Sequence, residues 1–188
     1  MRSLLAIALG LCVSAAAVRA EVYEVDAVHS TVGFGVRHMV VTTVKGNFGE
    51  FSGTVSYDAA DSASLKISGV VKAASINTGN EKRDDHLRNS DFFDVEKFPE
   101  ITFESTKFEN GVLTGNLTMK GVTKEISMPA TVNGPVTHPF SGKQAIGVDF
   151  TTKINRQDYG ISWSKSLDGG GLLVGDEVTL ELSIQALK

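Results

Sequence analysis

Four ionisable side chains stand next to one another in the segment Arg83-Asp84-Asp85-His86. A second polar group, Arg156, Asp158 and Tyr159, follows an apolar run, and His38 ends another. Arginine binds phosphate or carboxylate through paired hydrogen bonds, while histidine and tyrosine can hydrogen-bond a neutral oxygen. Histidine also titrates near neutral pH. These residues therefore have the chemistry either to bind the polar end of a ligand or to move a proton.

A catalytic arrangement is not evident around these residues. The sequence contains neither G-x-S-x-G nor H-E-x-x-H, and its single cysteine, Cys12, lies near the N-terminus. An enzyme acting on a small apolar substrate, with His38 or His86 as the acid–base group beside Asp84, is an alternative. It lacks a visible nucleophile and an oxyanion-stabilising group. We therefore predict no catalytic residues and a protein that is not an enzyme.

The histidines do not form a metal-binding motif. His29, His38 and His86 match no compact ligand spacing, and four zinc-type ligands are not evident after residue 20. We predict neither a metal site nor a cofactor.

Each polar residue also has a purely structural interpretation that the sequence leaves open. His38 could be a buried histidine whose hydrogen bonds are made by protein groups. His29 could belong to a local turn, and Arg156 could pair with Asp158 or another nearby acid. The charged run 83–86 could lie on a solvated, salt-bridged helix that closes one end of the fold.

The first 20 residues have the pattern of a secretory signal peptide. Arg2 gives a short positive region, an apolar run covers 4–13, and small side chains lead to Val18-Arg19-Ala20, after which we predict cleavage. The run is too short for a membrane-spanning helix, which needs about 20 apolar residues. We therefore expect export and a mature single domain of residues 21–188.

The predicted mature domain is acidic. Removal of residues 1–20 takes Arg2 and Arg19 from the 18 basic residues and leaves all 22 acidic ones, so the net charge becomes −6. This charge argues against nucleic-acid binding, which rests on clustered Lys and Arg, and against adsorption to anionic lipid head groups. We expect no nucleic-acid partner and no stable membrane insertion. The sequence leaves open whether the chain is a monomer or a homodimer.

Apolar and polar residues alternate along most of the chain, most clearly in the runs 65–73, 122–132, 146–154 and 178–186. Side chains point alternately to the two faces of a β-strand, so each run has one apolar and one wet face. Antiparallel sheets show this pattern, whereas parallel strands are apolar on both faces. The chain is therefore predicted to be all-β and antiparallel.

Turn residues and one helical segment complete the expected fold. Turns are predicted at Asn110-Gly111, Lys120-Gly121, Asn133-Gly134-Pro135, Ser141-Gly142 and Gly169-Gly170-Gly171. The apolar phase slips between Phe48 and Phe51 beside Gly49, which predicts a bulge that bends one long strand from about Val44 to Tyr57. The helical segment is 81–89, capped by Asn80, with Asp84 and Arg88 one turn apart. Eight or nine strands at this spacing form either a sandwich or a closed barrel.

Several segments, read in chain order, resemble the YceI-like family and together span nearly all of residues 21–188. They are YEVD (23–26), HS (29–30), VGFGVRH (32–38), VKGNF (44–48), FSG (51–53), SINT (75–78), RDDHLRNSDFFD (83–94), PEITFES (99–105), GNLTMKGVTK (115–124) and RQDYG (156–160).

This resemblance implies a lipocalin-like closed antiparallel β-barrel of about eight strands. It implies that the interior holds a polyisoprenoid, an isoprenoid quinone or a similar lipid. It also implies a periplasmic location, which the signal-peptide pattern supports independently. The expected function is carriage, storage or sequestration of the lipid. A scavenger of apolar stress molecules or drugs would use the same pocket and is the alternative.

We predict that one alternation phase lines the interior of the barrel. The expected cavity residues are Phe34, Val36, His38, Phe48, Leu117, Met119, Ile126, Met128, Phe150 and Ile154, with His38 either pointing into the barrel or lying at its mouth. The opposite phase, such as Asp149, Lys153 and Glu181, should face water. The polar end of the ligand is expected near His29, Arg83, Asp84, His86, Arg156 and Tyr159.

Overall fold

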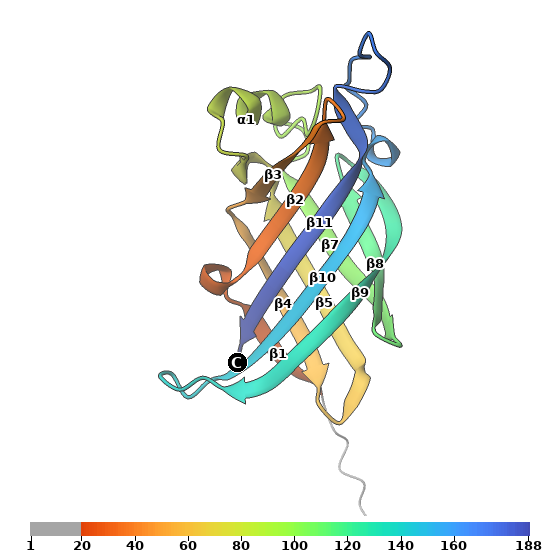
Figure 1. Cartoon of the computed structure of the whole chain (residues 1–188). Coiled ribbons are helices and arrows are strands. Elements are labelled where there is room, and N and C mark those ends of the chain that lie inside the picture. The colour runs from red at the N-terminus through yellow and green to blue at the C-terminus, as the bar shows by residue number, and fades with distance from the viewer. Residues whose placement is uncertain (1–19) are drawn as a thin grey trace, which may run out of the picture.

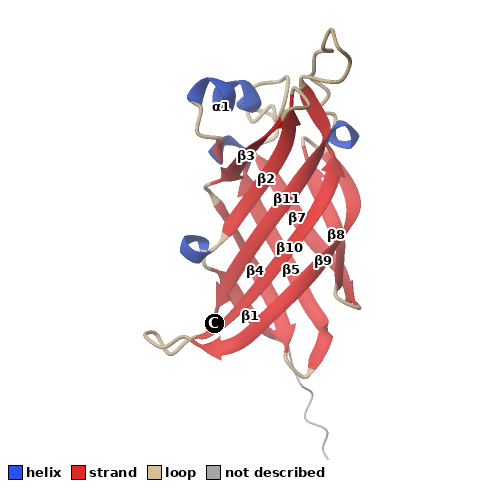
Figure 2. Ribbon diagram, in the orientation of Figure 1, coloured by secondary structure: helices blue, strands red, loops and turns tan. Residues whose placement is uncertain are grey.

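The computed structural model describes residues 20–188; the predicted signal peptide, apart from Ala20, lies outside this part of the chain. The described chain contains eleven strands, one α-helix and three short 3₁₀ turns (Figures 1 and 2). The strands are β1 (Glu21–Val25), β2 (Thr31–His38), β3 (Thr42–Phe48), β4 (Phe51–Asp58), β5 (Asp61–Lys72), β6 (Ile76–Asn77), β7 (Glu100–Glu109), β8 (Val112–Met119), β9 (Val122–Thr137), β10 (Gln144–Asn155) and β11 (Val174–Leu187). The helix is α1 (Glu81–Arg88), and the turns are η1 (Ala27–His29), η2 (Ala73–Ser75) and η3 (Arg156–Tyr159).

Antiparallel pairing closes the sheet into a barrel. The strand order is β1-β4-β5-β7-β8-β9-β10-β11, and β11 pairs again with β1. β2 pairs with residues 174–183 of β11, whereas β1 pairs with residues 186–187 of the same strand. β1 and β2 therefore lie end to end beside β11, separated by η1. The predicted closed antiparallel barrel of about eight strands is therefore confirmed.

The single bent strand predicted over 44–57 is wrong, because β3 ends at Phe48 and β4 begins at Phe51, and the two strands pair with different neighbours. Both phenyl side chains face the interior. Residues three apart on a regular strand point to opposite faces. The break at Gly49 and Glu50 therefore restores the inward phase.

Two hairpins have the predicted turns. Asn110-Gly111 joins β7 to β8, and Lys120-Gly121 joins β8 to β9, with φ between 49° and 76° at all four residues. Positive φ at both central residues matches the twist of the paired strands. The turn predicted at Asn133-Gly134-Pro135 is wrong, because these residues lie inside β9 beside a register shift between Ala145 and Gly147. Glycine in a strand can mark such an irregularity as well as a turn.

The predicted helix is present over Glu81–Arg88, and the Asn80 side chain caps it by accepting a hydrogen bond from the Arg83 backbone N–H at 3.1 Å. The expected pair of Asp84 with Arg88 does not form. Asp84 is buried against Thr78, and Arg88 instead pairs with Asp85 at 2.9 Å. Burial of Asp84 on the inner face of α1 therefore prevents the Asp84–Arg88 pair that the helical spacing predicts.

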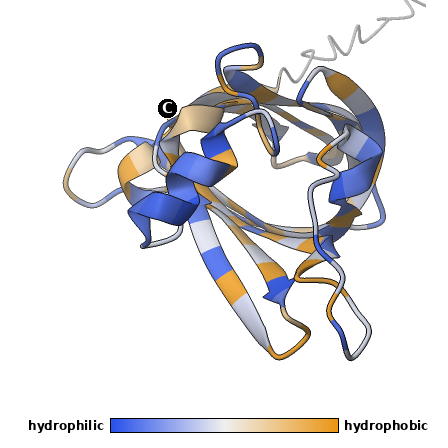
Figure 3. Cartoon of the chain, turned by 90° about the horizontal axis from the view of Figure 1, so that it is seen from above, coloured by the Kyte–Doolittle hydropathy of each residue, from blue (hydrophilic) through white to orange (hydrophobic). Residues whose placement is uncertain are grey.

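The end of the barrel opposite α1 is filled by packed side chains. We call this group the floor cluster; it includes Tyr23, Val55, Leu65, Leu113, Ile146 and Val148. A second buried cluster lies toward α1 and includes Phe48, Ile76, Phe92, Met119 and Ile161. Seen along the barrel axis, the hydrophilic α1 lies at the rim of this second end (Figure 3). The two ends of the barrel are therefore different, one solidly packed and the other covered by α1 and loops.

Candidate binding cavity

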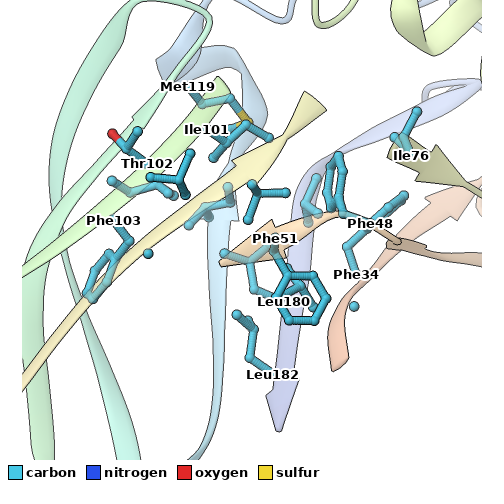
Figure 4. A pocket seen from close by; sticks show the side chains of 18 of the residues that line it. Phe34, Phe48, Phe51, Ile76, Ile101, Thr102, Phe103, Met119, Leu180 and Leu182 are labelled. Carbon is cyan, nitrogen blue, oxygen red and sulfur yellow. The ribbon is translucent and has the colours of Figure 1, made fainter. Parts of the chain in front are cut away.

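An apolar cavity of about 210 Å³ lies inside the barrel between the floor cluster and α1. Its wall is hydrocarbon almost throughout, with rings such as Phe34, Phe48 and Phe51 facing it (Figure 4). Within the described chain, the polar residues on this wall are Ser52, Ser68, Thr102 and Arg156. Such a surface suits an apolar molecule, because burying apolar area from water is favourable and burying an unpaired polar group is not.

Nine of the ten predicted cavity residues lie on this wall. They are Phe34, Val36, Phe48, Leu117, Met119, Ile126, Met128, Phe150 and Ile154. Their contact with a ligand remains a prediction. His38 is not among the wall residues; of the two positions expected for it, inside the barrel or at its mouth, its place at the end of β2 fits the second. It is the last residue of β2, paired with Thr42 on β3 and with the wall residue Val174 on β11.

Two rings on the wall lie over glycines of the neighbouring strand. A Cβ placed on Gly46 would come within 2.5 Å of Phe34, and one on Gly115 within 2.5 Å of Phe103. These glycines allow the rings to lie flat against the barrel and leave space at its centre. Sequence reasoning did not assign Phe51, Phe103 or their neighbours to the cavity, although a glycine inside a strand is a signal of close approach.

His29 lies apart from the other predicted head-group residues. It belongs to η1, on the side of the barrel between β1 and β2 (Figure 1). Its exposed ring contacts Asp26, with Nδ1 2.7 Å from Oδ2. Asp26 also caps this turn by accepting from the Val28 backbone N–H. The structural alternative, a local turn, is therefore what forms here.

Arg83 and Asp84 fasten α1 to the segment before it. The Asp84 carboxylate accepts hydrogen bonds from Thr78 N at 3.0 Å and from Thr78 Oγ1 at 2.5 Å. Arg83 donates from Nε to Thr78 Oγ1 at 2.7 Å and from Nη2 to Thr78 O at 2.9 Å. These bonds hold α1 over the end of the barrel.

His86 lies in an aromatic group on the inner side of α1. Its ring meets Phe92 and Trp163 edge-on, with centroids 5.0 and 4.9 Å away, and its Nε2 is 3.0 Å from Asp91 Oδ2. The acid–base pair imagined for an enzyme would need Asp84 to contact His86. In the described chain, Asp84 contacts Thr78 and His86 contacts Asp91.

Arg156 is the one charged residue on the wall within residues 20–188, and only 3% of its surface is exposed. It donates to Gly175 O at 2.9 Å, Ile161 O at 2.6 Å, Val174 O at 3.2 Å and Asp176 Oδ1 at 2.9 Å. Burial lowers the pKa of Arg156, and the nearby Asp176 carboxylate opposes that shift. Of the structural alternatives, a pair with Asp158 or with another nearby acid, the second forms, and the acid is Asp176. Four donor hydrogens already serve the protein, which leaves one on Nη1.

Tyr159 is 1% exposed, and its hydroxyl has no hydrogen-bond partner among the described residues. Burial, with a smaller contribution from the charge of Asp158, raises the pKa of Tyr159 to about 12. The residue belongs to the buried cluster below α1 but not to the cavity wall.

We expect Tyr159→Phe to leave the free energy of unfolding at neutral pH unchanged or raise it by up to about 1 kcal/mol, because it removes an unpaired buried hydroxyl. Folding favours the neutral phenol, since the pKa is about 10 when unfolded and about 12 when folded. Its contribution is fully present below about pH 10 and is lost as pH rises toward about 12. Urea unfolding across this range should therefore show a shallower alkaline loss in the variant. Tyr23→Phe is the control at neutral pH, where it should lower the free energy of unfolding because the Tyr23 hydroxyl donates to Glu21 at 3.1 Å. Parallel alkaline curves for wild type and Tyr159→Phe would contradict the expectation.

Within residues 20–188, no three His, Cys, Asp or Glu side chains are placed to hold a metal ion. In the same part of the chain, none of the helices has the length and apolar character needed to cross a bilayer.

The fold and the cavity define a lipocalin-like barrel with an apolar interior. The chain belongs to the YceI-like family, because the YceI-like domain matches residues 23–186. The UPF0312 protein SA2479 of Staphylococcus aureus strain N315 is 38% identical over 163 residues, which cover 87% of this chain and 95% of the relative.

Solved structures share the barrel. BcnA from Burkholderia cenocepacia is 25% identical with a TM-score of 0.74, covering 86% of this chain and 99% of BcnA. A polyisoprenoid binding domain from Saccharophagus degradans, implicated in plant cell wall breakdown, is 17% identical with a TM-score of 0.67, covering 88% of this chain and 97% of the domain. At that identity the second likeness shows the fold alone.

Proposed function

We propose that this protein binds the apolar tail of a long amphiphile inside its barrel and catalyses no reaction on it. The ligand class is a polyisoprenoid, an isoprenoid quinone or a similar lipid. The observation that carries the proposal is the enclosed cavity with an almost wholly hydrocarbon wall. Membership of the YceI-like family and the barrel shared with a polyisoprenoid binding domain support the ligand class.

The energetics of such a ligand favour an enclosed site. Each methylene group kept from water contributes about 0.8 kcal/mol, so a chain of some twenty groups resists leaving a membrane by roughly 16 kcal/mol. Carriage through water therefore requires a closed apolar sleeve. The measured affinity will be smaller than this sum, because ordering the chain costs free energy.

The difference between the two barrel ends supports one orientation of the ligand. The floor cluster fills one end, whereas Arg83, His86 and Arg156 lie at the other. The tail would point to the floor cluster, and the polar head would lie near α1. A buried polar head without a partner would cost about 1–3 kcal/mol, which favours this end.

The cavity must enlarge to accept a long chain. Its volume of about 210 Å³ is below the range of about 300–1,000 Å³ for pockets that hold drug-sized ligands. Met119 and Met128 on the wall have flexible side chains that can rearrange. Displacement of α1 and its loops would add further space at the end of the barrel that they cover.

We also propose that the protein acts in the periplasm, in carriage, storage or sequestration of its lipid. The signal-peptide pattern of residues 1–20 supports export. An intact mass that begins at Glu21, found in the periplasmic fraction, is the expected result. A mass that includes residues 1–20 would contradict it.

Native mass spectrometry of the exported protein, followed by organic extraction, tests the proposed ligand. We expect a bound amphiphile and an isoprenoid in the extract. Refolded, delipidated protein should take up an added polyprenol or isoprenoid quinone. Protein that is free of lipid after purification and also refuses both added isoprenoids would contradict the proposal.

A further inference from the structure

The hairpin between β2 and β3 ends in three exposed apolar residues. The exposed fractions of Met39, Val40 and Val41 are 44%, 57% and 77%. We call these three residues the hairpin tip. It lies at the same end of the barrel as α1 (Figure 1). There the Met39 N–H donates to Leu173 O at 2.9 Å, which joins the tip to the loop before β11.

The backbone of the hairpin tip does not suit its residues. φ is 52° at Met39 and 63° at Val40, and the turn is closed by Val41 N–H donating to His38 O at 3.1 Å. This left-handed conformation is disfavoured for residues with a Cβ, and a β-branched residue such as valine is an outlier there.

Two other hairpins of this chain place different residues in the same conformation, namely Asn110-Gly111 and Lys120-Gly121. Asparagine and glycine are the usual choice for such turns. The apolar pair Met39-Val40 opposes both the local backbone preference and exposure to water. Val40 Cγ2 packs against Gly171 of the neighbouring loop, but 57% of Val40 stays exposed. This contact does not explain why apolar residues are exposed at the tip, whereas an interaction outside the barrel would.

The size and charge of the hairpin tip favour a bilayer over a protein partner. Specific protein interfaces use about 20–30 residues on each side, far more than this tip offers. Shallow insertion into a bilayer uses a few apolar side chains, while nearby cations stay at the level of the lipid head groups. The exposed Arg37 fits this arrangement, because its Nη2 donates to Val40 O at 2.5 Å at the base of the tip. Lys165 is exposed on the neighbouring loop, together with one acid, Asp168.

We propose that the hairpin tip inserts reversibly into the interfacial region of a lipid bilayer and turns the α1 end of the barrel toward the membrane. The purpose of this contact rests on the proposed function: a barrel whose α1 end faces the membrane could exchange a lipid between bilayer and cavity without exposing it to water. The net charge of −6 over residues 21–188 opposes adsorption to anionic surfaces. Apolar insertion is therefore the main contribution, and vesicles of neutral phosphatidylcholine suffice for binding.

The double substitution Met39→Asn, Val40→Gly tests this directly. It installs the residues that the turn prefers, so the thermal midpoint should stay the same or rise. Association with phosphatidylcholine vesicles in a flotation assay should fall by about tenfold, because two exposed apolar side chains are lost. Val41→Ser, outside the left-handed positions, should weaken association in the same direction.

Phe140→Ser is the matched control. Phe140 is 94% exposed, but it lies in the loop between β9 and β10 at the opposite end of the barrel (Figure 1). If any exposed apolar residue promoted adsorption to vesicles, Phe140→Ser would reduce flotation the most. The proposal instead predicts that Phe140→Ser leaves flotation unchanged. A loss in Phe140→Ser equal to that in the tip variant would overturn the proposal.

The isoprenoid content of each protein separates this inference from the proposed function. A tip variant that holds a polyprenol loaded from detergent but no longer floats with vesicles supports both. Wild-type protein that carries a polyprenol yet does not float overturns the membrane contact alone. Wild-type protein that floats but takes up no isoprenoid overturns the proposed function and leaves the membrane contact standing.

Discussion

Replacing Arg156 by alanine is expected to lower the free energy of unfolding by about 3–5 kcal/mol. The guanidinium joins the segment after η3 to the start of β11 through the carbonyls of Ile161, Val174 and Gly175. Without the guanidinium, these carbonyls and the Asp176 carboxylate lose their hydrogen-bond donor, and water has little access to replace it because Arg156 is buried. Urea unfolding at neutral pH, followed by circular dichroism, measures the loss.

Two variants control this experiment. Arg156→Lys retains the charge but not the planar fork of donors, so it should recover only part of the stability. Arg83→Ala removes a half-buried arginine whose bonds all go to Thr78, and it should cost about 1 kcal/mol. A loss below that of Arg83→Ala would show that the bonds of Arg156 contribute little to the fold.

The bonds of Arg156 also bear on the head group of the ligand. The residue types alone suggest that Arg83 and Arg156 hold a pyrophosphate, and that His38 holds a quinone oxygen. Both arginines are hydrogen-bonded within the protein, and His38 is not among the residues that line the cavity. We therefore expect the tail to provide most of the affinity. A selective loss of a pyrophosphate-headed ligand in an Arg156 variant of normal stability would restore the head-group role.

Sequence alternation predicts the direction of a side chain but not the depth at which it lies. Ile146, Val148, Phe150 and Ile154 share one phase of β10 and all point inward. Phe150 and Ile154 line the cavity, whereas Ile146 and Val148 are packed in the floor cluster and do not reach it; Phe150 belongs to both. Whether the interior is filled or hollow at a given level depends on residues that other strands bring to that level. The register between strands determines which residues meet at each level. The local alternation pattern of one segment does not specify that register.

The polar contacts were harder to predict than the apolar wall, because they join distant parts of the chain. Asp158 is the acid nearest to Arg156 in sequence, but the barrel brings Asp176 to its guanidinium. Asp84 and Arg88 have helical spacing, but burial turns Asp84 toward Thr78. By contrast, the Asn80 cap and the two hairpin turns depend on local backbone chemistry and were predicted correctly.

The second large effect is expected from enlarging a side chain on the cavity wall. Met128 lies where the wall meets the floor cluster, and Met119 lies toward α1. A closed barrel cannot expand freely, so Met128→Trp should shorten the longest tail that the protein accepts. Losing room for two methylene groups is worth about 1.6 kcal/mol, or more than tenfold in affinity for the longest chains. Met119→Trp narrows the cavity at the α1 end of the barrel. It should therefore lower the fraction of protein that carries a lipid, whatever the length of the tail.

Native mass spectrometry with a mixture of polyprenols of different length measures both effects in one experiment. Both tryptophans enter existing space, so the loss in stability should not exceed about 1–3 kcal/mol. Asn116→Trp is the control, because Asn116 is exposed on the same strand as Met119, in the opposite phase. Its occupancy and length profile should equal those of the wild type. Unchanged profiles in both methionine variants, at unchanged stability, would mean that the tail does not occupy this cavity.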